Sequence, residues 1–120
     1  MTLRPQGRLS VLLLTICLVL SSAITVRPAD FISLIRQSRE QSQNDQFVEA
    51  LASAQDAVRA NAKDYKGYYY VAVAYLGMGS FNEAETAAAS SLQLAPASFK
   101  PGVERLVDAI KTRRQLASPP

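Results

Sequence analysis

The stretch between Tyr65 and Pro96 constrains the fold of this chain more than any other. Its first half places large and small apolar residues at spacings of three, four and seven, which is one face of a helix: Tyr68, Val71, Ala72 and Tyr75. Gly79 and Ser80 interrupt the pattern. A second helical face then follows, made mostly of small residues: Phe81, Ala84, Ala88, Ser91 and Leu92. The stretch therefore predicts a helical hairpin with closely packed backbones, which needs neighbours to cover its apolar faces.

An earlier segment has the same pattern at a constant offset in residue number, the step from 47 to 81. The matched pairs are Phe47 and Phe81, Glu49 and Glu83, Ala50 and Ala84, Ala54 and Ala88, and Val58 and Leu92. A helix is predicted over 31–43, with Phe31, Leu34, Ile35 and Ser38 on one face. Asn44 and Asp45 break it, and a second helix is predicted over 46–60. Two hairpins of the same build are therefore expected.

The second hairpin resembles the tetratricopeptide repeat, in which Trp-x2-Leu-Gly-x2-Tyr is followed by Ala-x3-Phe and a closing Pro. The matches, in order along the chain, are Tyr68 for Trp, Val71-Ala72 for Leu-Gly, Tyr75 for Tyr, Ala84 for Ala and Pro96 for Pro. Ala88 stands where Phe is usual. The first hairpin departs further, with Leu34, Gln37, Ser38, Gln41 and Ala62 at the corresponding positions.

The offset between the two hairpins equals the repeat length of that family. The resemblance implies an all-α stack of about five helices over 30–115. The expected stack contains repeat 1 at 31–64, repeat 2 at 65–98 and a cap helix at 99–115. A disordered tail is expected after it, at 116–120.

Local signals place the helix starts. N-caps are predicted at Asp30 (or a start at Pro28), Asp64, Ser80 and Ser98. Ser80 and Glu83 have the spacing of a capping box, in which each side chain bonds the other residue's backbone N–H. Pro101 falls in the first turn of the fifth helix, where its missing donor does no harm.

The fifth helix has one apolar side and a cationic end. The apolar side is predicted to close the stack: Val103, Leu106, Val107 and Ile110. Lys111, Arg113 and Arg114 crowd its last turn, where they favour the helix dipole and form either a solvated end or a docking patch. Two repeats and a cap are few for a stack of this kind. We therefore expect either marginal stability or self-association through the N-terminal face of the first repeat.

Residues 1–26 have the pattern of a targeting segment. Arg4 and Arg8 precede an apolar run over 9–20, and Ser21-Ser22-Ala23 provides small residues for a signal peptidase. The sequence predicts a signal peptide over 1–23, hence export to the periplasm or cell surface of a bacterium. The alternative is an uncleaved N-terminal anchor over 9–26 in the inner membrane. Cys17 follows Ile16 rather than a small residue, so it is read as an ordinary leader residue rather than a lipidation site.

The composition leaves little chemistry available. The chain has no His and a single Cys, which cleavage would remove, so the usual general base, thiolate nucleophile and metal-ligand cluster are missing. Glu83 and Glu85 are two apart in the chain and point to different sides of their helix. The net charge is +3 for the whole chain and +1 without Arg4 and Arg8, too little for a nucleic-acid-binding face. The sequence therefore predicts no enzymatic activity, no cofactor and no nucleic-acid partner.

What remains is a surface for a protein or peptide partner. In the family that the chain resembles, the first helix of each repeat lines a concave groove. By position this puts ten residues in the groove: Ile35, Arg36, Arg39, Lys66, Tyr69, Tyr70, Val73, Leu76, Val103 and Val107, with Glu104 beside them. Tyr69 and Tyr70 either contact a partner or pack on the neighbouring helices. The family's clamp for C-terminal carboxylates needs polar residues where this chain has Ile35, Tyr69 and Tyr70. The expected ligand is instead a peptide segment with apolar anchors, and with an acidic residue to pair with Arg36 and Arg39.

Two functions follow from these patterns. The first is an exported, non-catalytic adaptor or scaffold that holds a protein partner in its concave groove. The second is a membrane-tethered structural subunit that acts mainly by oligomerising. The two differ in whether the bond between Ala23 and Ile24 is cut.

Overall fold

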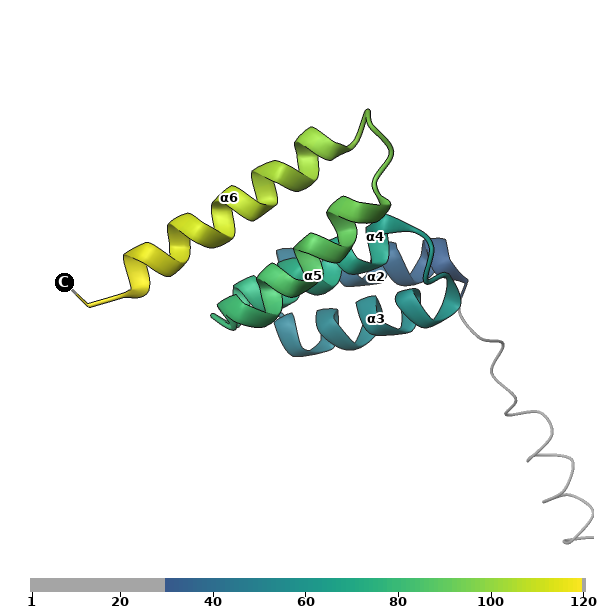
Figure 1. Ribbon diagram of the computed structural model, residues 1–120. Coiled ribbons are helices and arrows are strands. Elements are labelled where there is room, and N and C mark those ends of the chain that lie inside the picture. The colour runs from purple at the N-terminus through teal and green to yellow at the C-terminus, as the bar shows by residue number, and fades with distance from the viewer. Residues whose placement is uncertain (1–29, 120) are drawn as a thin grey trace, which may run out of the picture.

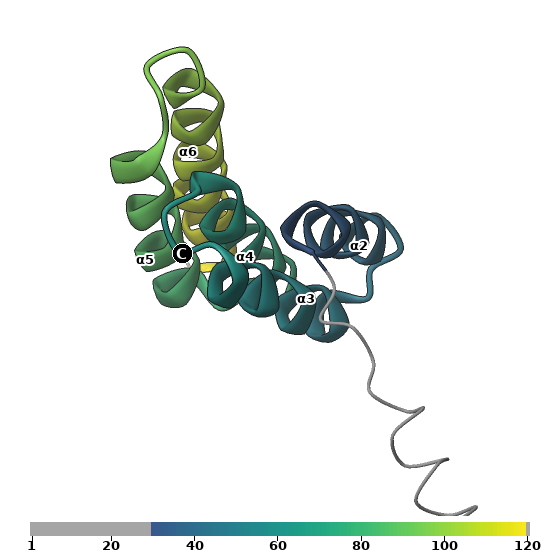
Figure 2. The ribbon, with the colours of Figure 1, turned by 90° about the vertical axis from the view of Figure 1, so that its right-hand side faces the viewer.

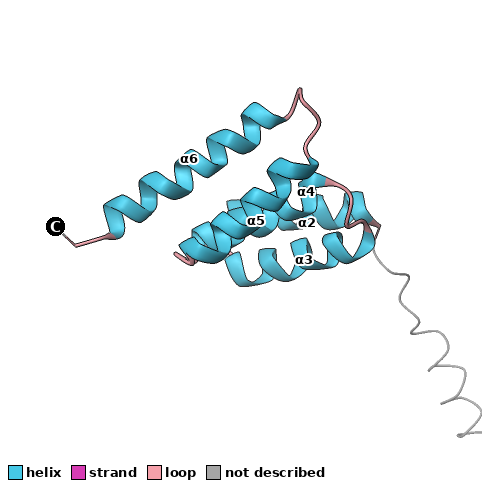
Figure 3. Cartoon of the chain, viewed as in Figure 1, coloured by secondary structure: helices cyan, strands magenta, loops and turns pink. Residues whose placement is uncertain are grey.

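The computed structural model describes residues 30–119 of the chain, and this part is built of helices joined by short connections (Figure 1). There are five: α2 (Phe31–Gln43), α3 (Phe47–Ala60), α4 (Tyr65–Gly77), α5 (Phe81–Leu94) and α6 (Lys100–Ala117). No strand occurs between residues 30 and 119, as Figure 3 shows, which confirms the predicted all-α class. The predicted signal peptide over 1–23, or anchor over 9–26, lies outside the described residues. None of the five helices is both long and apolar enough to cross a bilayer.

Helix α4 is the centre of the arrangement. It packs against α3 and α5, its neighbours in the chain, and also against α2 and α6. In Figure 2 α2 lies on one side of α4, and α5 and α6 lie on the other. Helices α2 and α6 do not contact each other, nor do α3 and α5. The helices therefore form two rows, with α2, α4 and α6 in one and α3 and α5 in the other.

Small residues form much of the core, as the helical faces predict. Ala50, Ala54, Ala84 and Ala88 are completely buried, and they are two of the pairs that the repeated pattern matches. Small side chains let two helix backbones approach closely, so the contact area comes from many short contacts rather than from a few large side chains. The completely buried Ser38 is satisfied within the core, since its Oγ donates to the Ala50 carbonyl at 2.8 Å.

Helix α6 supplies the bulkiest completely buried residues. Val103 and Ile110 are buried to within 1% of their surface, and Leu106 is also buried. All three lie on the side of α6 that the sequence predicts to be apolar. Helix α6 packs against α5 and α4. The closing role expected of this helix is consistent with these contacts.

Two glycines allow α3 and α4 to pack closely. A Cβ added at Gly77 would lie 2.3 Å from ring carbons of Phe47, and one added at Gly67 would lie 2.8 Å from a methyl carbon of Val58. Both partners are on α3. The absence of a side chain at two points of α4 therefore lets the whole length of α3 lie against it.

The α2–α3 turn and the α4–α5 turn have the same backbone structure. Each contains one residue in the left-handed region, Asp45 with φ 60° and Gly79 with φ 76°, at equivalent positions of the two hairpins. In each turn three consecutive backbone N–H groups donate to carbonyls of the preceding helix: Asn44 to Glu40, Asp45 to Ser42 and Gln46 to Gln41 in the first, and Met78 to Ala74, Gly79 to Leu76 and Ser80 to Tyr75 in the second. Every donor and acceptor in the second set follows its counterpart in the first by the same offset that relates the two hairpins.

The N-cap predictions are half right. Asp30 accepts a hydrogen bond from the Ser33 N–H at 2.7 Å, and Asp64 accepts one from the Lys66 N–H at 2.9 Å. Ser80 is the N-cap of α5, but its side chain makes no capping bond. The predicted capping box is therefore wrong, because the Ser80 N–H that Glu83 would need is already donated to the Tyr75 carbonyl at 2.9 Å.

Both ends of α6 differ from the prediction. Its N-cap is Phe99 rather than Ser98, because a turn at residues 97–99, held by the Pro96 carbonyl, leads directly into the helix. Pro101 lies in the first helical turn, as expected. At the other end α6 continues through Ala117, which is inside the predicted tail. Ser118 closes it there, since its N–H and its hydroxyl both donate to the Arg114 carbonyl.

Candidate functional site

A cavity of about 390 Å³ opens on the row formed by helices α2, α4 and α6. Its lining comes from the middle of α2, the first two turns of α4, and the start of α6 with the turn before it: Ile35, Arg39, Tyr65, Lys66, Tyr69, Tyr70, Phe99, Gly102 and Val103. Helices α2 and α6 do not touch each other, so the cavity lies over α4 with one of them on each side. Six of the ten predicted groove residues are among the nine that line it.

Four aromatic rings make up much of the cavity wall. Tyr69 and Tyr70 meet edge to face, with ring centroids 5.2 Å apart and planes at 78°. Tyr65 stacks on Phe99, with centroids 5.4 Å apart and planes at 27°. These are favourable ring geometries, so each pair holds its members in place. Phe99 is still 52% exposed, which leaves apolar surface at the mouth of the cavity.

The two tyrosines predicted for the groove lie between the core and the cavity. Tyr69 and Tyr70 are each half-buried and pack against the buried cluster around Val71 and Ala72. They nevertheless border the cavity. Removing either ring would therefore affect stability as well as the site, and experiments on the site need other residues.

Burial also changes the acidity of the phenol groups. Desolvation raises the pKa of Tyr69 above its usual value, and neighbouring Tyr70 adds to the effect, while the positive charge of Arg105 opposes it. Desolvation likewise raises the pKa of Tyr65, with Asp64 as the next cause. Both phenols are neutral at physiological pH, as tyrosine ordinarily is, and they can donate to an oxygen of a ligand.

The cavity lining contains two charged residues, and both are cations. Arg39 on α2 and Lys66 on α4 are exposed, and Lys66 Nζ lies 6.0 Å from the centroid of the Tyr65 ring. Within residues 30–119 the ion pairs join Arg59 to Asp56 and Arg114 to Glu85, so neither cation of the cavity takes part in one.

The other four predicted groove residues do not line the cavity. Val73, Leu76 and Val107 are partly buried against the core cluster, so their apolar side chains serve packing. Arg36 is exposed on α2, near enough to Asp30 that its charge contributes, after two hydrogen bonds from Ser33, to lowering the pKa of that carboxyl. Glu104 is exposed on α6, next to Val103 but not in the lining.

Three lining residues were missed, and a signal for two of them was present. Tyr65 and Phe99 are separated by the offset of the repeated pattern, and Phe31 precedes Tyr65 by the same offset. The period that aligned the small core residues therefore also aligns an aromatic residue at the start of α2 and α4 and just before α6. Gly102 had no such signal, since it enters the lining only because α6 begins beside α4.

The opposite side of α4 has two further hollows. One, of about 390 Å³, is lined by α4 and α5 and includes Tyr68, Tyr75 and Asn82, and the other is lined by α3 and α4 and includes Tyr68 and Arg59. Tyr68 and Val71 on α4 line both hollows, and α3 and α5 do not contact each other. Neither includes a predicted groove residue.

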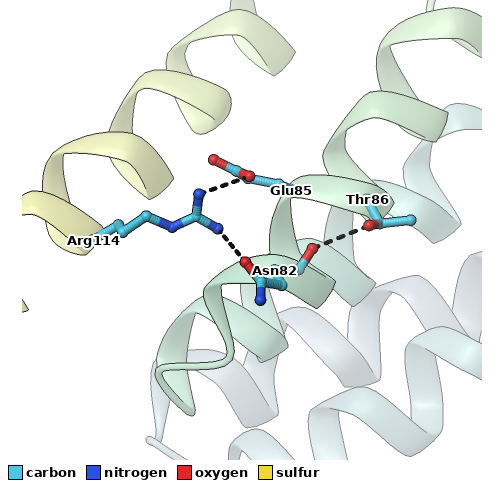
Figure 4. A network of polar contacts seen from close by, with 4 residues as sticks. All are labelled: Asn82, Glu85, Thr86 and Arg114. Carbon is cyan, nitrogen blue, oxygen red and sulfur yellow. Dashed lines mark hydrogen bonds and ion pairs between the residues drawn. The ribbon is translucent and has the colours of Figure 1, made fainter.

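The polar contacts between α5 and α6 are structural in character. Arg114 near the end of α6 pairs with Glu85 at 3.0 Å and donates to the Asn82 side chain at 2.8 Å, which anchors the two helices to each other (Figure 4). The backbone carbonyl of Asn82 also accepts a hydrogen bond from the Thr86 hydroxyl. One of the three cations predicted for this helix end is thus paired, while Lys111 and Arg113 are exposed. Among residues 30–119 there is no group of three or more Asp, Glu, His or Cys that could hold a metal ion.

Comparison with known proteins adds no assignment. No model of a protein family matches the chain, and no curated protein matches it significantly.

Proposed function

We propose that this chain is an exported, non-catalytic adaptor that binds a protein or peptide partner in the cavity over α4. In this proposal the two hairpins are tetratricopeptide-like repeats, α2–α3 and α4–α5, and α6 is their cap. The row formed by α2, α4 and α6 is then the concave side of the stack.

The observation that carries the proposal is the cavity itself. Six residues chosen by position on three separate helices come together around one opening, with aromatic walls and exposed cations. Aromatic and arginine side chains are the residues that most often carry binding energy at protein interfaces. The three matched hydrogen bonds of the two turns and the shared period of the buried alanines support the repeat assignment.

The proposed location rests on the sequence of the leader alone. Cleavage after Ala23 would release the helical domain into the periplasm or to the cell surface. Intact mass of the protein purified from its native envelope distinguishes this from an anchored form.

Site-specific photocrosslinking tests the proposed binding surface. A benzoylphenylalanine placed at Lys66 is at the cavity mouth, and the side chain there is exposed, so the substitution spares the core. The matched control is Ala52, an exposed residue in the middle of α3, in the other row of helices. The proposal predicts a crosslinked product of defined mass from position 66 in native envelopes and none from position 52. Equal patterns at both positions, or no product at position 66, would contradict it.

The second candidate function, a tethered subunit that acts by oligomerising, is favoured by one observation. Two apolar side chains of the first hairpin are largely exposed, Ile32 at 68% on α2 and Val48 at 69% on α3. Burying such side chains would favour association. Sedimentation of the wild type and of Ile32→Asp at several concentrations tests this. Oligomerisation that the substitution abolishes supports the second candidate, and a monomer throughout removes it.

A further inference from the structure

We propose that the segment bound in the cavity over α4 is an acidic peptide with an aromatic side chain, whose ring enters the cavity while its carboxylates meet Arg39 and Lys66. This inference rests on the proposed function, and it names the chemistry of the partner.

The charge of the cavity differs from that of the domain around it. Three of the chain's 13 basic residues, Arg4, Arg8 and Arg27, precede residue 30, so the described part has ten basic and ten acidic residues and is neutral overall. The lining of the cavity nevertheless contains two cations and no carboxylate. A neutral domain with a local positive site attracts a negative ligand to that place and not to its surface in general.

Neither cation of the lining takes part in an ion pair within residues 30–119. Arg39 comes from α2 and Lys66 from α4, and the ion pairs of the described part involve other residues. A third cation, Arg105 on α6, lies near enough to affect the pKa of Tyr69. Two cations from different helices therefore line the opening, and a third lies near the Tyr69 side of it. A ligand with a carboxylate on each side of its ring can offer one partner to each of these two cations.

The interior of the cavity favours a ring. Tyr65, Tyr69, Tyr70 and Phe99 provide faces and edges, and aromatic rings pack with one another more favourably than their buried area alone predicts. The volume of about 390 Å³ lies near the lower end of the range for ligand pockets, so it suits one or two side chains rather than a folded domain. The phenol groups of Tyr65 and Tyr69 can donate to the carbonyls of the bound segment.

Fluorescence anisotropy with labelled peptides tests the inference. The probe is a Gly-Ser dodecapeptide with a central Asp-Phe-Glu. Three matched peptides replace Phe by Ala, the two acidic residues by Lys, or the two acidic residues by Gln. The protein is the full chain, compared with the double variant Arg39→Glu/Lys66→Glu. The control, Lys111→Glu/Arg113→Glu, makes the same change in net charge at exposed residues near the far end of α6. Far-UV circular dichroism verifies that both variants fold.

We expect the acidic Phe peptide to bind more tightly than each of the others by about tenfold or more. The Arg39/Lys66 double variant weakens its binding by a similar factor, whereas the control changes it less than about twofold, and added salt weakens binding to the wild type. No binding of the acidic Phe peptide at millimolar concentration, equal binding of the Lys peptide, or equal effects of the two double variants would overturn the inference.

Two further outcomes separate this inference from the function on which it rests. A crosslink at Lys66 together with equal affinity for the Gln peptide overturns the acidic ligand and leaves peptide binding in place. A labelled oligothymidylate of the same length that binds as tightly as the acidic peptide, with the same sensitivity to Arg39→Glu/Lys66→Glu, overturns the inference in favour of a general polyanion site.

Discussion

Substituting the two left-handed turn residues, Gly79 by Ala and Asp45 by Gly, tests whether the hairpins are equivalent. Asp45 has φ 60° and Gly79 has φ 76°, and three backbone hydrogen bonds around each are matched. A Cβ added at Gly79 would meet no atom within 4 Å. The effect of a substitution there is therefore that of backbone conformation alone, without a steric term from neighbouring groups.

The magnitudes follow from the preference of each residue for positive φ. An L-residue in the left-handed region costs about 1–2 kcal/mol, and Asp is among the residues that tolerate it best. Glycine avoids this cost but loses more conformational entropy on folding, by about 0.4–1 kcal/mol relative to alanine. Gly79→Ala should therefore lower the free energy of unfolding by about 1 kcal/mol. Asp45→Gly should change it by at most about 0.5 kcal/mol, in the direction of greater stability.

Urea unfolding followed by far-UV circular dichroism measures both variants and the double variant. The two turns are separate, so the effects should add within about 0.5 kcal/mol. Thermal midpoints should follow, with a fall of about 4–8 °C for Gly79→Ala. Gly79→Ala without loss of stability, or Asp45→Gly with a loss above about 1 kcal/mol, would refute the assignment of these two residues to the same backbone role.

Three other predictions concern packing, the α5–α6 contact and pH. Gly77→Ala places a methyl group against the Phe47 ring and should destabilise the chain by about 1–3 kcal/mol in urea unfolding, whereas a neutral effect would show that α3 and α4 are further apart than described. Arg114→Ala removes a pair with Glu85 that is about one-third exposed, so it should cost only about 0.2–1 kcal/mol by the same measurement, and a larger loss would contradict the view of it as a surface contact. Burial raises the pKa of Tyr69, so the phenol proton is lost from the unfolded chain at a lower pH than from the folded chain. The free energy of unfolding should therefore fall as pH rises above about 10, and Tyr69→Phe should reduce this fall. An unchanged pH dependence in Tyr69→Phe would show that Tyr69 is not the group responsible.

The helices were predictable because their signals are local and repeated. Helix α2 begins and ends as the sequence predicts, and the buried alanines fall at the expected positions on α3 and α5. The pattern occurs twice at one fixed offset, so weak signals in the first hairpin gain support from the second. The capping box failed for a reason that sequence does not contain: the Ser80 N–H is already used by the turn before it.

The cavity was only partly predictable, because it depends on how α6 lies against α4. Position on the helix identified Tyr69, Tyr70 and Val103, but it also selected Val73 and Leu76, which pack against the core. Whether a residue on a groove-facing side stays open depends on the approach of the next helix, which is a tertiary property. Phe99 belongs to a connection rather than to a helical face, and therefore periodicity within the helices could not find it.

Chemical-shift mapping measures the central claim most directly, since it reports on every part of the domain at once. The labelled chain is titrated with the acidic Phe peptide, and backbone amide shifts are followed. Binding over α4 predicts that the largest changes cluster at Ile35, Lys66, Gly102 and Val103, on three helices that are far apart in sequence. Changes concentrated instead around Tyr68 and Asn82, on the opposite side of α4, or no localised changes at all, would contradict the account.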